Sequence, residues 1–152
     1  MPRLKVVAHR KSGHLVKGFA DLDVPLDASG VPTTHSIKLP TQLSIHPVAH
    51  EKAVRLPVNT LKAIFFVRSF EGNPSYAETK FFNPEPEIEG LWVHLTFEDG
   101  ETTEGIVHNS ISLLNDPGFL MRPPDPNSNN QAVYVLKSAI TRFRVVGVRS
   151  HY

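Results

Sequence analysis

The residues best suited to bind a partner lie in a proline-rich polar segment near residue 125. Arg122, Asp125, Asn129 and Asn130 offer a cation, a carboxylate and two amides, and prolines stand at positions 123, 124 and 126. Prolines restrict the backbone, and a stiff loop loses less conformational entropy on binding. These four residues are the predicted protein-binding site. The alternative interpretation is that the Asn and Asp side chains hydrogen-bond their own backbone in Asx turns.

Basic residues form a second candidate group, in the first half of the chain. Residues 1–70 contain ten Lys or Arg and four Asp or Glu, whereas residues 71–152 contain six and eleven. A basic half favours contacts with nucleic-acid phosphates, which would weaken steeply with salt. The alternative is that the two halves attract each other. The candidate nucleic-acid-binding residues are Lys5, Arg10, Lys11, Lys17, Arg55 and Lys62. Of these, Lys5, Arg55 and Lys62 are expected on outward positions of strands.

No combination of residues in the sequence matches a known catalytic or metal-binding pattern. His46 and His50 are the only close histidine pair, but a proline intervenes, and their spacing binds metals on a helix rather than in an extended segment. His9 and His94 are expected on the outward side of their strands. Asp125 begins a pattern that is similar to the start of a calcium loop. The sequence here lacks the glycine and the glutamate that such a loop requires. We therefore expect a non-enzymatic protein without a cofactor or metal.

Composition narrows the class of protein further. The chain has 152 residues and no cysteine, which excludes a disulfide framework and fits a reducing compartment. No stretch approaches the roughly 20 apolar residues that a membrane span needs, and the N-terminus does not resemble a secretory signal. A cytoplasmic protein that does not contact membranes is the expectation.

Short segments with β-branched and aromatic residues dominate the sequence, and prolines and glycines separate them. No window longer than about ten residues keeps a helical period. Short helical turns could form near residues 59–63 or 136–139. Strands are predicted at residues 4–10, 54–58, 61–67, 91–97, 131–136 and 140–146.

An internal repeat organises these strands. Gly13 and Gly18 follow the first strand with the same spacing as Gly100 and Gly105, an offset of 87 residues. The first glycine of each pair suits a hairpin turn, and the second suits a bulge or a sharp bend within the returning strand. Residues 43–47 and 61–67 match residues 119–123 and 137–143 with an offset of 76. The first half should therefore carry about eleven extra residues near residues 24–39.

The pattern of strand, turn glycine, four residues, glycine and apolar residue resembles the first signature of Sm-like (Hfq-like) small barrels, a variant of the SH3-like roll. The resemblance covers residues 4–67 and 91–146. It implies a bent sheet of about five strands in each half. The Asp-x-x-Met-Asn segment and the second signature of Sm-like RNA binders are missing, so the resemblance does not extend to their uridine pocket. Residues 117–130 also resemble an uncharacterised bacterial domain associated with regulatory proteins.

The sequence thus predicts an all-β protein of two tandem SH3/Sm-like barrels. The first would span residues 1–70 and the second residues 91–152, with an acidic, proline-rich connector at residues 71–90. The predicted function is a binding or regulatory module that engages a protein partner through its loops. The alternative is an Sm-like RNA- or DNA-binding protein that uses its basic half. The oligomeric state is left open.

Overall fold

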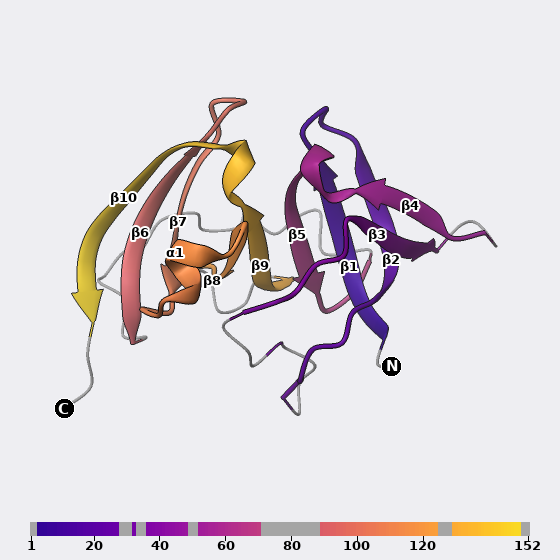
Figure 1. The fold of residues 1–152 in the computed structure, drawn as a ribbon, viewed down its shortest axis with the longest axis horizontal. Coiled ribbons are helices and arrows are strands. Elements are labelled where there is room, and N and C mark those ends of the chain that lie inside the picture. Colours follow the sequence, from indigo (N-terminus) through magenta and orange to yellow (C-terminus); the bar gives the residue numbers. More distant parts are fainter. Residues whose placement is uncertain are drawn as a thin grey trace.

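The computed structural model describes residues 3–27, 32, 36–48, 52–70, 89–124 and 129–149. Within them the chain forms ten strands, which confirms the predicted all-β class (Figure 1). The strands are β1 (Arg3–Arg10), β2 (Leu15–Asp21), β3 (Gln42–Pro47), β4 (Val54–Pro57), β5 (Leu61–Val67), β6 (Gly90–Phe97), β7 (Thr102–Val107), β8 (Gly118–Arg122), β9 (Asn130–Leu136) and β10 (Ile140–Arg149). The predicted connector falls almost entirely outside the described residues.

All ten strands belong to one antiparallel sheet with the order β10-β6-β7-β8-β9-β5-β1-β2-β3-β4. Strands β5-β1-β2-β3-β4 therefore repeat the order of β10-β6-β7-β8-β9. The two sets join where β9 pairs with β5, in the middle of the sheet in Figure 1. This pairing leaves β10 and β4 as the two edges of the sheet.

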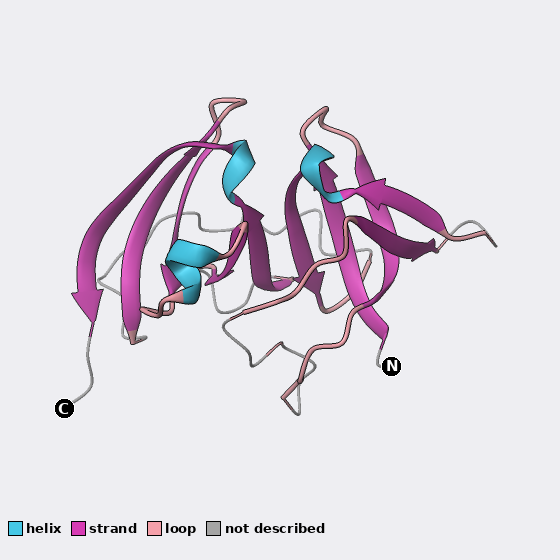
Figure 2. Cartoon of the chain, in the orientation of Figure 1, coloured by secondary structure: helices cyan, strands magenta, loops and turns pink. Residues whose placement is uncertain are grey.

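Short helices occupy corresponding places in the two halves (Figure 2). A single 3-10 turn at Val58–Thr60 precedes β5, and another at Lys137–Ala139 precedes β10. The sequence pointed to helical turns close to both positions. It gave no sign of α1 (Ser112–Asn115), a single turn between β7 and β8.

The strand register confirms the first part of the predicted repeat. Val6 pairs with Gly18 in β1 and β2, and Val93 pairs with Gly105 in β6 and β7, so the offset of 87 holds for both strands of the hairpin. The offset of 76 holds for β3 and β8, because Ala20 pairs with Ile45 and Val107 pairs with Met121. The change from 87 to 76 agrees with the eleven extra residues expected between β2 and β3.

The predicted offset of 76 is wrong for the closing strands. The 3-10 turns begin at Val58 and at Lys137, and β5 and β10 begin at Leu61 and at Ile140, an offset of 79 in each case. The register agrees, since Val6 pairs with Phe66 and Val93 pairs with Val145. The second half has gained three residues in the loop between β8 and β9. Ile64 therefore corresponds to Phe143 rather than to Ile140.

The second glycine of each hairpin allows two strands to approach closely. A Cβ atom added at Gly18 would lie 2.3 Å from the backbone oxygen of His46, and one at Gly105 would lie 2.3 Å from the Met121 side chain. The first glycines have positive φ angles, +93° at Gly13 and +89° at Gly100, as their hairpin turns require. The predicted turn role of Gly13 and Gly100 is confirmed. At Gly18 and Gly105 the strand register shows no bulge, and it is the close approach of the next strand that requires glycine.

Two apolar cores lie on opposite faces of the central strands. The first contains β1–β5 side chains together with Ala132, Tyr134 and Leu136 of β9. The second contains β6–β9 side chains together with Ala63 of β5. Because side chains alternate between the faces of a strand, each central strand contributes to both cores. The centre of the sheet is therefore buried on both sides.

Candidate functional site

The predicted polar loop is partly used for structure. Asn129 accepts a hydrogen bond from the Ser69 amide through Oδ1 (3.0 Å) and donates one from Nδ2 to the Ser69 carbonyl (2.8 Å). Its own carbonyl accepts from the Arg68 amide at 3.0 Å. Asn129 thus fastens the end of β5 to the start of β9. It bonds the backbone across the junction rather than in an Asx turn of its own loop.

The other loop candidates are placed differently from one another. Arg122 is exposed at the end of β8, whereas Asn130 is half-buried as the first residue of β9, where it pairs with Val67. Asp125 lies outside the described residues. The structure does not bring the four predicted residues together as one described site.

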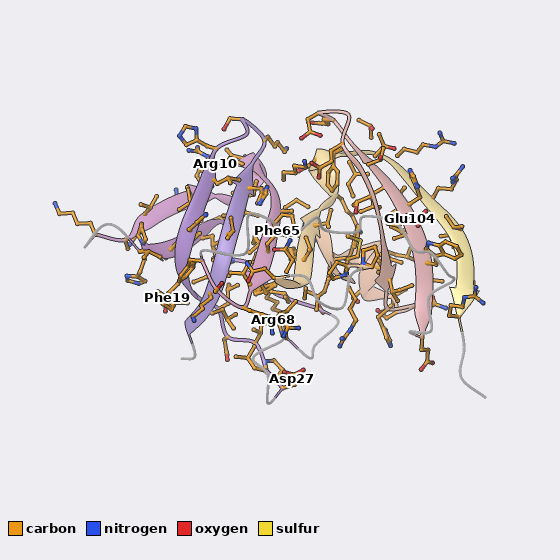
Figure 3. All side chains as sticks on the ribbon, turned by 180° about the vertical axis from the view of Figure 1, so that it is seen from behind. Arg10, Phe19, Asp27, Phe65, Arg68 and Glu104 are labelled. Carbon is orange, nitrogen blue, oxygen red and sulfur yellow. The ribbon has the colours of Figure 1, made fainter. Side chains whose placement is uncertain are left out.

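Three of the basic candidates are exposed on one face of the first half. Lys5 pairs with Phe19, and Val7 pairs with Lys17, which places both lysines on the face of β1 and β2 opposite the first core. Arg55 lies on the corresponding face of the edge strand β4 and is also exposed. Of the remaining candidates, Arg10 ends β1 at the β1–β2 hairpin (Figure 3), and Lys11 lies in the turn that follows it.

The predicted outward position of Lys62 is wrong. Its ammonium group lies 2.7 Å from Asp99 Oδ2 and 3.4 Å from Glu101 Oε1, and it stands 4.5 Å from the centre of the Phe97 ring. The Lys62 side chain is only 11% exposed. Strand alternation misleads here because β5 is covered on both faces. This lysine of the basic half binds the acidic hairpin of the other half, as the alternative interpretation of the charge asymmetry expects.

Next to this ion pair lies His9, which the sequence placed towards solvent. Its ring centre is 4.1 Å from that of Phe65 (labelled in Figure 3), which lies on the face of β5 that packs against the second core. Burial, and then the positive charge of Lys62, lower the pKa of His9 to about 4, although Glu101 acts in the opposite direction. His9 is therefore neutral near pH 7 and packs as an aromatic group.

Two other histidines lie beside carboxylates. His46 Nε2 lies 3.1 Å from Asp21 Oδ2, and His94 Nδ1 lies 3.5 Å from Glu104 Oε2. His50, the second member of the predicted pair, is outside the described residues. No group of three metal-ligating side chains occurs in the part of the chain that the structure describes.

The main exposed apolar surface lies elsewhere, on β10 and beside α1, where no sequence motif predicts a site. Eight large hydrophobic side chains are exposed among the described residues, and six of them lie here. They are Ile111, Leu114, Phe143, Val145, Val146 and Val148. Contiguous exposed apolar surface on a folded protein commonly marks an interaction site. We call these six residues and the free side of β10 the β10 edge.

A groove of about 390 Å³ lies at the start of β10, between α1 and residues 140–143 of the strand. Phe119 forms its floor and meets Phe143 edge-on, with ring centres 5.5 Å apart. Phe143 and Val145 pair with Leu95 and Val93 of β6, so they share the core-facing side of the sheet. They remain 38% and 46% exposed because no described strand lies beyond them.

The other face of β10 is basic. Arg142 and Arg144 pair with Thr96 and His94 of β6, which places them on the side away from the second core. Both side chains are exposed, and neither has an ion-pair partner among the described residues. The edge thus alternates apolar and cationic side chains.

The fold and this surface define an all-β protein built as one antiparallel sheet with an open apolar edge. The chain belongs to DUF6982, a family of unknown function, whose model matches residues 2–147. No curated protein and no solved structure matches the chain. Among the described helices, none has the length and apolar character needed to cross a membrane.

Proposed function

We propose that this chain is a non-enzymatic binding or regulatory module that engages a protein partner. The observation that supports the proposal is the concentration of exposed apolar side chains on the β10 edge. Leu114 is 75% exposed and Val148 is 61% exposed. Removing such apolar side chains from water lowers the free energy of a complex, so a partner that covers them is stabilised. The exposed Arg122 at the end of β8 is a second candidate contact, separated from β10 by β7 and β6 in the sheet.

The proposal includes the architecture expected from the Sm-like resemblance, in which each half is a small barrel-like unit. The shared strand order and the 3-10 turn before each closing strand support this. Small β modules of this type present edges and loops to partners, and exposed strand edges are templates for pairing.

Site-specific photo-cross-linking in cell extract tests the protein-binding function. A photoreactive phenylalanine analogue would replace Leu114 on the β10 edge, Arg122 by the polar loop, or Leu15, an exposed leucine of β2 that serves as control. A discrete protein adduct from position 114, absent from position 15, is expected. An adduct from position 122 would add the loop to the interface. Identical adducts at all three positions, or none, would overturn the proposal.

Nucleic-acid binding is the second candidate function, because Lys5, Lys17 and Arg55 are exposed on one face of the first half. Lys62 does not belong to this surface, since it binds Asp99 and Glu101. Titration with mixed RNA and DNA oligonucleotides at two salt concentrations tests it. Binding that weakens with salt and with a Lys5→Glu/Lys17→Glu variant is expected. Absence of salt-sensitive binding would exclude this function.

A further inference from the structure

The closing strands of the two halves differ in their pairing. Among the described strands, β5 has a neighbour on each side, β1 and β9, whereas β10 pairs with β6 on one side only. In the first half, β9 lies against β5 and inserts Ala132, Tyr134 and Leu136 into the first core. Tyr134 is 1% exposed and stands directly opposite Ile64. A strand from outside the first half therefore completes that core.

With the offset of 79, the residues that surround this inserted strand have counterparts on β10. Leu61, Ile64 and Phe66 correspond to Ile140, Phe143 and Val145. The first set is at most 2% exposed, whereas Phe143, which lines the groove, is 38% exposed, and Val145, two residues further along β10, is 46% exposed. The groove is the counterpart of the space that β9 fills in the first half.

From this comparison we propose that the β10 edge binds an extended peptide segment of a partner protein as an additional antiparallel strand. The segment would place apolar side chains at alternate positions into the groove, as Ala132, Tyr134 and Leu136 do beside β5. Main-chain hydrogen bonds along β10 supply affinity, and the alternate side chains supply specificity. This inference rests on the proposed protein-binding function and names the class of ligand.

Charge on the opposite face specifies the intervening residues of the ligand. In the β5–β9 junction, Val135 and Val133 stand opposite Ala63 and Phe65 and pack in or against the second core. The counterparts of Ala63 and Phe65 on β10 are Arg142 and Arg144, both exposed. Opposite charges on directly paired residues stabilise a sheet. The bound segment should therefore alternate apolar and acidic residues.

The free edge β4 of a second copy of this chain fits the groove poorly. With the same offset, the positions of Ala132, Tyr134 and Leu136 are held by Ala53, Arg55 and Pro57. A guanidinium group would replace the tyrosine ring in an apolar groove, at a cost in desolvation, and the proline has no amide hydrogen to donate. A partner of different sequence is thus favoured over self-assembly.

Fluorescence anisotropy with the full chain tests the inference. The probe is a labelled eight-residue peptide with alanine, tyrosine and leucine at alternate positions and glutamate between them. We expect saturable binding, at least tenfold weaker for a peptide of the same composition with the apolar residues adjacent. A peptide with N-methylated amides on its pairing edge should not bind, because it cannot extend the sheet.

The matched variant Arg142→Glu/Arg144→Glu changes only exposed side chains. It should bind the glutamate peptide at least tenfold more weakly and should gain affinity for the corresponding lysine peptide, which also shows that the variant is folded. Equal binding of ordered and scrambled peptides, or no binding of any peptide, would overturn the inference. Concentration-dependent self-association by light scattering, abolished by the same variant, would instead assign the edge to a second copy. Cross-linking of a partner from position 114 without peptide binding would leave the proposed function standing and remove this ligand class.

Discussion

Strands β5 and β10 occupy the same position in the two halves but meet very different surroundings. β5 lies between β1 and β9, and all of its residues are buried except Phe65, which is half-buried. Among the strands that the structure describes, β10 pairs with β6 alone, and it is exposed along most of its ten residues. Position in the repeat thus sets the pairing register, whereas the neighbour on the far side decides whether the strand is core or surface.

The largest expected difference between the two strands is in the cost of removing corresponding side chains. Ile64→Ala empties a fully buried site and should lower the free energy of unfolding by about 3 kcal/mol. Phe143→Ala removes a larger side chain that is 38% exposed, and should cost only about 1 kcal/mol. Urea denaturation of both variants measures this. Equal losses would contradict the difference in covering.

The cost of replacing the second glycine of each hairpin with alanine should also differ between the two halves. A methyl group at Gly18 meets the backbone of β3, which cannot move without disturbing the sheet, so Gly18→Ala should cost about 3 kcal/mol. At Gly105 the nearest atoms belong to the flexible Met121 side chain, although the Arg122 carbonyl is 2.9 Å away, and about 1–2 kcal/mol is expected. Thermal and urea unfolding would show the order, and a reversed order would refute this account of the hairpins.

His9 should make the β1–β5 contact sensitive to pH. Burial lowers its pKa in the folded chain to about 4, whereas an unfolded histidine titrates near 6.5. The neutral ring is therefore favoured by folding, and its stabilisation is complete above about pH 6.5 and lost as pH falls towards 4. Relative to His9→Phe, the wild type should lose about 2 kcal/mol over this interval. Parallel pH profiles for the two proteins would contradict the prediction.

Lys62→Met tests the link between the two halves with the smallest expected change in stability. Asp99 and Glu101 are 50% and 43% exposed and remain hydrated without the lysine, so a loss of about 1 kcal/mol is expected. The pKa of His9 should rise, because the Lys62 charge lowers it, and the pKa of Asp99 should rise as its hydrogen bond is lost. NMR titration measures both. Lys5→Met, an exposed control, should leave the His9 value unchanged.

Local sequence patterns predicted the hairpins well because their causes are local. Gly13 and Gly100 are needed for turns, and Gly18 and Gly105 for close strand contacts, so glycine spacing alone located two hairpins. The closing strands were misaligned by three residues because an Ala-Ile pair occurs in both halves at positions that do not correspond. The longer β8–β9 loop, which creates the shift, leaves no local signal.

The candidate site was harder to predict because it depends on which strands become neighbours. The alternation of apolar and polar residues predicts that the Lys62 side chain points outward. It is buried against Asp99 only because the two halves join in one sheet. Asn129 reads as a loop residue, and only the β5–β9 junction gives it Ser69 as a partner. The alternation of Arg142, Phe143, Arg144 and Val145 was visible as a strand. That this strand lies at the edge of the sheet could be recognised only from the order of the strands in the structure.

Amide hydrogen exchange of the free, full-length chain tests the central claim most directly. Within the described strands, β5 is paired on both sides and β10 on one side only, so amides throughout β5 should be strongly protected. Along β10, every second amide, which points away from β6, should exchange rapidly. Protection of both sets of β10 amides to the level seen in β5 would show that the edge is already paired, and would contradict the account.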